Sequence, residues 1–192
     1  MNLTKLFFAA VIVLSANAAF AQDTKTANHL VTITIPQVAL LDLEVASGTT
    51  DVTLAGTAPS EAGLPMTFGA AATNSAIWMN YSSIVKGALL RNVTVAITNG
   101  TVPTGLKLTV LASAAAGGAG TLGAASTELI LTGTAQNIVT AIGSAYTEDG
   151  ANKGRNLTYQ LGYAVDAAAN YGALRFVDTA APLTITYTLT DI

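Results

Sequence analysis

The strongest pattern along the chain is a regular alternation of hydrophobic and polar residues. It is clearest near the C-terminal end, where Leu183, Ile185, Tyr187 and Leu189 alternate with four threonines. A period of two places the hydrophobic side chains on one face of a β-strand, and threonine suits a solvated face. The pattern therefore predicts a half-buried strand over residues 183–190.

Shorter runs of this kind recur along the chain and are separated by turn residues. They predict further strands at residues 29–35, 38–45, 51–55, 65–68, 76–81, 92–98, 106–111, 128–132 and 156–165. The segment 136–142 differs, because Ile138, Val139 and Ile142 have the spacing of a short amphipathic helix. About ten strands and one short connecting helix predict an all-β protein, an immunoglobulin-like Greek-key β-sandwich.

The N-terminus has the features of an export signal. Lys5 precedes an apolar run at residues 6–14, and the small residues Ala19 and Ala21 follow as an A-x-A cleavage site. We therefore predict a signal peptide at 1–21 and a single domain at 22–192, with 22–36 as a tether and candidate donor strand. The run is shorter than the roughly 20 residues of a membrane-spanning helix, and no later segment is longer. The expected location is the periplasm in transit, then the cell surface or the extracellular space.

Composition and charge remove several classes of function. The chain is 51% hydrophobic and 10% charged, with one histidine and no cysteine. Loss of Lys5 with the signal would leave 7 basic residues against 11 acidic ones, a formal charge of −4. The basic residues are scattered, whereas nucleic-acid binding needs them clustered against phosphates. Without cysteine there can be no disulfide and no thiolate metal site, and we expect no cofactor.

Few residues could carry catalysis. The only histidine, His29, lies at the start of a predicted strand, next to a polar tail, and lacks a partner for nucleophilic chemistry. Glycoside hydrolysis needs two acids that face each other across a cleft. The candidates are Asp42 and Glu44, which share one side of a predicted strand. Two acids on one strand face more often point into water. We therefore expect a protein that is not an enzyme.

Two groups of residues are weak candidates for ligand binding. Trp78 and Tyr81 could stack on a sugar, but strand alternation places them on opposite faces, and we expect Trp78 in the core. Glu148, Asp149 and Asn152 could offer oxygen ligands to calcium. Their spacing matches no EF-hand, so an ordinary hairpin loop is the preferred interpretation.

Two predicted strands are free of charge. Neither residues 30–35 nor 183–190 contain the lysine or proline that usually protects a strand edge from pairing with another chain. A polar tether followed by alternating Val31, Ile33 and Ile35 has what strand donation to a neighbouring subunit requires. The alternative is that this segment is the first strand of its own sheet, and the sequence leaves both open.

These features together resemble bacterial fimbrial subunits of the chaperone-usher and spore-coat-U kind. The likeness lies in the layout: an export signal, an alternating N-terminal strand, a Thr/Ala/Gly-rich sandwich and a terminal strand ending Ile185-Thr-Tyr-Thr-Leu-Thr190. It implies an immunoglobulin-like fold that completes a missing strand by donor-strand exchange, with a periplasmic chaperone and an outer-membrane assembly factor as partners. The implied donor side chains are Val31, Ile33 and Ile35, and the implied accepting ones are Leu183, Ile185, Tyr187 and Leu189. Many such subunits have a cysteine pair, which this chain lacks.

The sequence thus predicts a homopolymeric structural subunit of a bacterial surface fibre or extracellular matrix, acting in adhesion or biofilm. The alternative is a monomeric exported sandwich that binds a glycan or protein ligand through its loops and exposes Trp78.

Overall fold

A computed structural model describes residues 25–176 and 182–192 of the chain. The chain divides into two units, Met1–Ile35 and Pro36–Ile192. In the first unit, the described residues 25–35 contain no helix or strand. The predicted signal peptide at 1–21 lies outside the described residues.

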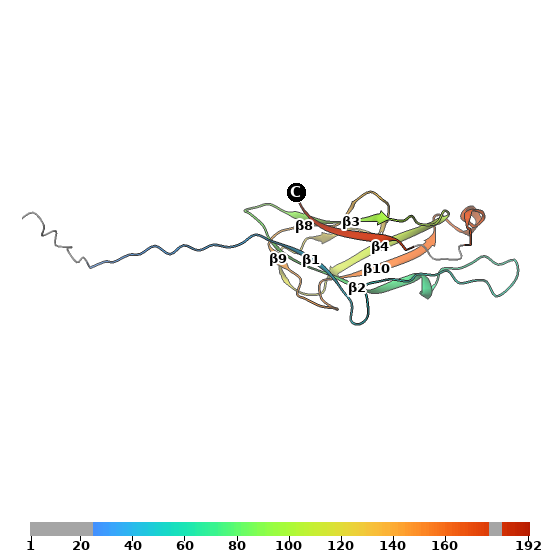
Figure 1. Cartoon of the computed structure of the whole chain (residues 1–192), viewed down its shortest axis with the longest axis horizontal. Helices are drawn as coiled ribbons and strands as arrows, with labels where there is room; N and C mark the ends of the chain where they lie inside the picture. Colours follow the sequence, from blue (N-terminus) through green and yellow to red (C-terminus); the bar gives the residue numbers. More distant parts are fainter. Residues whose placement is uncertain (1–24, 177–181) are drawn as a thin grey trace, which may run out of the picture. The chain divides into compact units, whose positions relative to one another are not determined.

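The second unit consists mainly of two antiparallel β-sheets (Figure 1). The larger sheet has seven strands. Six of them follow the order β5 (Ala119–Gly120), β9 (Ala145–Tyr146), β2 (Thr73–Ile84), β10 (Arg155–Tyr163), β4 (Leu106–Ala115) and β7 (Leu129–Ile130). The seventh, β1 (Val38–Glu44), pairs with β2 and lies outside this order.

The smaller sheet has four strands. Their order is β11 (Thr184–Asp191), β3 (Arg91–Asn99), β8 (Gln136–Ile142) and β6 (Ala124–Ala125). The described residues contain little helix. Short helical turns occur at η1 (Ala70–Ala72), α2 (Ala167–Asn170) and η2 (Tyr171–Ala173).

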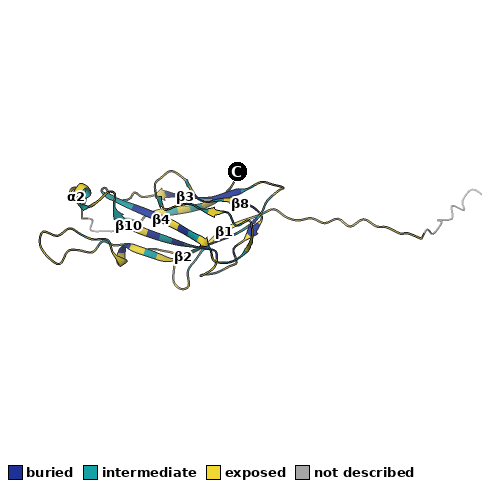
Figure 2. Ribbon diagram, turned by 180° about the vertical axis from the view of Figure 1, so that it is seen from behind, coloured by how far each residue is buried: buried dark blue, intermediate teal, exposed yellow. Residues whose placement is uncertain are grey.

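The hydrophobic core lies between the two sheets. Strands β2, β4 and β10 contribute buried side chains from one sheet, and β3 and β8 from the other (Figure 2). The alternation in the sequence explains this packing in the regular stretches of these strands, because every second residue there faces the core. The fully buried members are Met79, Val93, Val95, Val110, Ile138, Val139, Ile142 and Leu157.

The predicted all-β sandwich is confirmed, and most long strands lie where the pattern placed them. The helix predicted at 136–142 is wrong, because this segment is strand β8. Its pairing with β3 shifts register twice, between Arg91 and Val93 and between Val93 and Thr94. Each shift places one extra residue in β8 and breaks the period of two, so the buried residues have a spacing that imitates a helix.

Three other strand predictions differ from the structure. No strand is assigned at 29–35 or 51–55, and the segment 65–68 forms only an isolated bridge between Thr57 and Thr67. The short connecting helix exists, but it is α2, between β10 and β11.

Within the described part of the chain, no helix is long and apolar enough to cross a membrane.

Candidate functional site

The N-terminal unit presents hydrophobic side chains to solvent. Val31, Ile33 and Ile35 are 71%, 82% and 73% exposed, and Leu30 is almost fully exposed. The described residues 29–35 are assigned to no strand. The segment therefore has the alternation of a strand without forming one.

The second unit has two neighbouring sheet edges. Strand β1 lies at the edge of the larger sheet, and β11 lies at the edge of the smaller one. The two strands approach each other. Strand β11 pairs with β3 on one side, and among the described residues no strand pairs with its other side. An unpaired edge of this length offers a row of backbone donors and acceptors to another strand.

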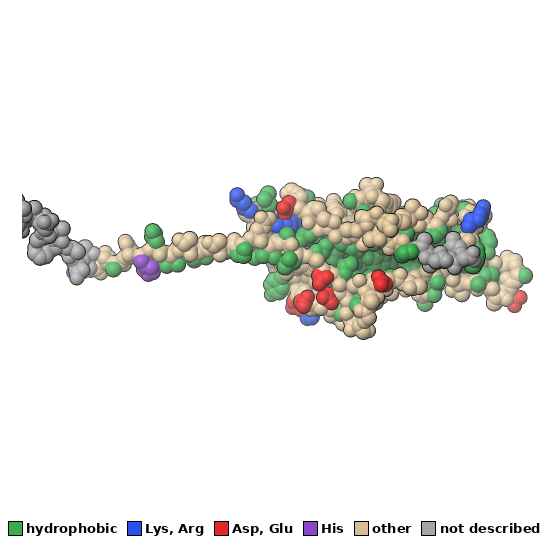
Figure 3. Space-filling model, in the orientation of Figure 1, with side chains coloured by type: hydrophobic (Ala, Val, Ile, Leu, Met, Phe, Trp, Pro, Cys, Tyr) green, Lys and Arg blue, Asp and Glu red, His purple; other side chains and the backbone are tan. Residues whose placement is uncertain are grey.

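Hydrophobic side chains line the space between these two edges. We call this set the edge strip; all its members are only partly buried against the core. Figure 3 shows hydrophobic side chains gathered in a hollowed band along the second unit, where Figure 1 places β11 and β1. The edge strip consists of Leu41, Leu43, Val45, Val52 and Leu54 from β1 and the segment after it, and Leu183, Ile185, Tyr187 and Leu189 from β11 and the residue before it.

The opposite face of β11 is polar. Thr184, Thr186 and Thr188 are exposed, and the hydroxyl groups of Thr186 and Thr98 lie 2.7 Å apart across the strand pair. The residues predicted to accept a donor strand therefore share one face, as their alternation indicated.

One member of the edge strip, Tyr187, forms a pair with a second tyrosine, Tyr159. The hydroxyl oxygens of Tyr187 on β11 and Tyr159 on β10 are 2.7 Å apart, so a hydrogen bond joins the two sheets. Burial raises the pKa of Tyr159 to about 12 and raises the pKa of Tyr187 well above its ordinary value. Both hydroxyls therefore stay protonated at physiological pH.

A buried arginine joins the two edges at one end of the edge strip. Arg91, at the start of β3, is 1% exposed, and its Nε donates to Asp191 Oδ1 of β11 at 2.6 Å. Its Nη1 donates to the carbonyl of Val38 at the start of β1, and to Ser83 Oγ of β2 at 3.0 Å. One guanidinium thus ties together four strands that meet at this end.

The ligand candidates at Trp78 and Tyr81 do not form a platform. Tyr81 is buried in the core, where its hydroxyl donates to the carbonyl of Leu122 and accepts from Arg155 Nε at 3.1 Å. The expectation that Trp78 is the core tryptophan is wrong. It is half-buried on the opposite face of β2 from Ile77 and Met79, since those positions already fill the core side of the strand.

The acidic candidates also do not converge. Glu148 forms an ion pair with Lys153, and this neighbour lowers the pKa of the Glu148 carboxyl. Asp149 lines a surface pocket with Glu148 and Asp42, while Asn152 adopts a left-handed turn conformation. Within the described residues, no three His, Cys, Asp or Glu side chains are placed to hold a metal ion.

The catalytic candidates differ in their surroundings. Asp42 is exposed and Glu44 half-buried on β1, and only Asp42 lines that pocket. His29 is exposed in the N-terminal unit.

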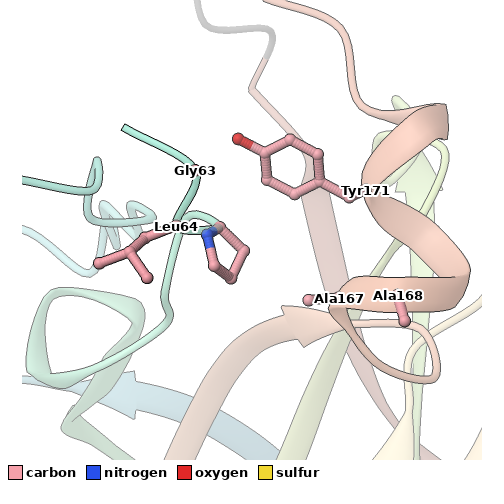
Figure 4. A pocket seen from close by; sticks show the side chains of 6 residues that line it. Gly63, Leu64, Ala167, Ala168 and Tyr171 are labelled. Carbon is pink, nitrogen blue, oxygen red and sulfur yellow. The ribbon is translucent and has the colours of Figure 1, made fainter. Parts of the chain in front are cut away.

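A surface pocket lies where the loop before η1 approaches α2. It has a volume of about 560 Å³ and is lined by Gly63, Leu64, Pro65, Ala167, Ala168 and Tyr171. Figure 4 shows the ring of Tyr171 extending from the helical segment toward the loop that carries Gly63 and Leu64. We call it the tip pocket; no charged side chain lines it.

In comparisons with known proteins, no family model, no curated protein and no solved structure matches this chain.

Sequence reasoning missed Arg91 as part of this site. It was one of seven scattered cations, yet it is the only charged residue in the strand segment 91–99. A single arginine in an otherwise uncharged strand is a usable signal, because a buried guanidinium needs several acceptors and therefore marks a junction.

Proposed function

We propose that this chain is an exported structural subunit of a bacterial surface fibre or extracellular matrix. Residues 29–35 of one copy are donated to the edge strip of the next, where they add a strand beside β11. Repetition of this step produces a homopolymer. The function is mechanical and adhesive, and requires no catalytic group.

The observation that carries the proposal is the unpaired edge of β11 above partly buried hydrophobic side chains. An edge of this kind is unusual in a stable monomer, because it exposes both backbone groups and apolar surface. An added strand would pair the backbone and cover Leu183, Ile185, Tyr187 and Leu189. Strand addition of this type gains affinity from the main chain and specificity from alternate side chains.

The strand order supports the same proposal. The order β1-β2-β10-β4 is the same as that of strands A, B, E and D in an immunoglobulin-like sandwich, and β11 beside β3 is like F beside C. Strand β8, which follows β4 in the chain and pairs with β3, has no counterpart in that arrangement. In an immunoglobulin-like sandwich the remaining strand, G, pairs with F. Among the described residues nothing occupies this position, which is the outer edge of β11.

Residues 29–35 fit the vacant position in length and in side chains. Seven extended residues span about 23 Å and the eight residues of β11 about 27 Å. Full burial of an aliphatic side chain stabilises by about 1.5–3 kcal/mol. Val31, Ile33 and Ile35 are largely exposed in the single chain, so most of this free energy is available to drive assembly.

Export under this proposal passes through the periplasm. The open edge of β11 would have to be protected there from wrong pairing. A periplasmic chaperone and an outer-membrane assembly factor would meet that need.

The alternative function is a monomeric sandwich that binds a glycan or protein ligand. The tip pocket favours it, because it is an uncharged surface site formed by a loop and two helical turns. It leaves the exposed segment 29–35 and the open edge of β11 without a role. We therefore favour the polymer.

Size-exclusion chromatography with negative-stain electron microscopy tests the proposal. The chain of residues 22–192 should form ladders or filaments, and a chain beginning at Gln37 should not. Monodisperse monomers from both chains would favour the ligand-binding sandwich. A monomeric longer chain beside an unfolded shorter one would show that residues 29–35 complete their own domain.

A further inference from the structure

The connection between residues 29–35 and the second unit is short. Only Pro36 and Gln37 separate Ile35 from Val38, the first residue of β1. Three Cα–Cα steps cover at most about 11 Å. Proline also fixes its own φ and holds the residue before it extended, so this joint is stiff. A donor strand therefore brings its own domain against the domain that receives it.

The direction of the donor strand decides which ends meet. Every strand pair in both sheets is antiparallel, and antiparallel pairing is the more stable kind. A donor antiparallel to β11 ends, at Ile35, beside the start of β11. The start of β11 lies at the same end of the receiving domain as α2 (Figure 1).

The receiving end carries the tip pocket. Its lining side chains are uncharged, and Leu64 and Tyr171 are both exposed there. The loop before η1 is held to the sheet by Tyr163, whose hydroxyl donates to the carbonyl of Met66 at 2.8 Å. The pocket is therefore anchored to the larger sheet at this end, through β10.

The donating end also exposes hydrophobic side chains. Val38 and the turn between β2 and β3 both lie at this end. Arg91, the residue after this turn, donates a hydrogen bond to the carbonyl of Val38. Leu89 in this turn is 53% exposed. Ile192 is exposed as well, and its N–H donates to the carbonyl of Leu90 at 3.1 Å, which places it beside the turn.

We infer that adjacent copies make a second, end-to-end interface, in which Leu89 and Ile192 of the donating copy pack into the tip pocket of the receiving copy. The inference rests on the proposed function, since strand donation across a short joint brings these two ends together. The partner is a second copy of this chain. The contact would stiffen the fibre and would cover apolar surface at both ends.

Charge substitutions at the two ends test the inference. In the chain of residues 22–192, Leu89→Lys and Tyr171→Asp should each weaken assembly by at least about tenfold, measured by sedimentation velocity across a concentration series, because each replaces buried apolar surface with a charge. The double variant, Leu89→Lys with Tyr171→Asp, should recover much of the loss, because the new charges are opposite and close.

Ile130→Lys is the matched control for Leu89→Lys. Ile130 is also 53% exposed, but it lies on β7, at the far edge of the larger sheet from β1. It should assemble like the unsubstituted chain. Equal weakening by Ile130→Lys and Leu89→Lys would overturn the inference, because the effect would then come from surface charge alone.

A second measurement separates this inference from the proposed function. A fluorescent peptide of residues 25–36 is titrated into full-length 22–192 chains that carry Ile33→Asp, with and without Tyr171→Asp. The peptide has no domain, so it should bind both chains with equal affinity. No binding to either chain would overturn strand donation itself. Equal binding, together with normal assembly of the Leu89→Lys and Tyr171→Asp variants, would overturn only the end-to-end interface.

Discussion

The substitution Ile33→Asp examines strand donation with the least disturbance of the subunit. Ile33 is 82% exposed in the single chain, so the folded second unit should keep its thermal stability. In the assembled state the same side chain would lie against the edge strip. The variant loses the burial of an isoleucine, about 1.5–3 kcal/mol, and places an unpaired carboxylate in an apolar site, which costs several kcal/mol more.

Together these effects exceed about 4 kcal/mol, which corresponds to a roughly thousandfold weaker association. Thr34→Asp is the matched control, because it adds the same charge one residue away on the opposite side of the period-two pattern. It should weaken association by less than about tenfold. Sedimentation velocity gives the association, and circular dichroism gives the thermal stability of each variant.

Two results would refute the reasoning. Assembly of Ile33→Asp within about threefold of the unsubstituted chain would mean that Ile33 is not buried between subunits. Equal weakening by both substitutions would mean that charge in the tether, and not the alternation of its side chains, controls assembly.

Three further predictions concern the domain itself. Arg91→Met should lower the free energy of unfolding by about 1–3 kcal/mol in urea titrations, because it leaves the buried hydroxyl of Ser83 and the half-buried carbonyl of Val38 without this donor; a loss below about 0.5 kcal/mol would contradict the junction role. The raised pKa values of Tyr159 and Tyr187 predict stability that is complete below pH 10 and decreases as the pH rises toward 12, and phenylalanine at both positions should remove most of this alkaline loss in urea titrations. Gly118→Ala should lower thermal stability strongly, since φ is +91° and a Cβ would lie 1.9 Å from a backbone carbonyl oxygen, whereas Gly172→Ala has open space and should be nearly neutral; equal melting temperatures would refute this.

Much of the fold could be predicted from the sequence because the alternation is strong where strands are half-buried. Strand β11 is the best example, with its four hydrophobic side chains on one face and its threonines on the other. Strand β8 could not be predicted in the same way. Its register shifts against β3 allow the consecutive residues Ile138 and Val139 both to be buried. A search for a regular period of two does not detect such a bulge.

Trp78 shows a different limit of sequence reasoning. The alternation correctly separated it from Ile77 and Met79, but it could not tell which of the two faces is the core. The tryptophan was expected to be the buried residue because a large aromatic side chain suits the core of a sandwich. The structure instead buries its two neighbours, which belong to the same core cluster as residues of β3 and β8.

The candidate site was visible in sequence only in part. The side chains of residues 31–35 and 183–189 were identified, because charge is absent from both segments. The open edge of β11 depends on strand order, which no local pattern encodes. Arg91 was missed for the same reason, since its acceptors on β1 and β11 are distant in sequence.

The central claim is that residues 29–35 of one copy pair with β11 of another. Its most direct test uses an isotope-labelled chain of residues 22–192 with Ile33→Asp, titrated with an unlabelled peptide of residues 25–36 and followed by amide hydrogen exchange in NMR. The account predicts new protection of amides on β11, between Thr184 and Asp191, and little change on β6. Unchanged exchange along β11, or protection confined to another edge, would contradict it.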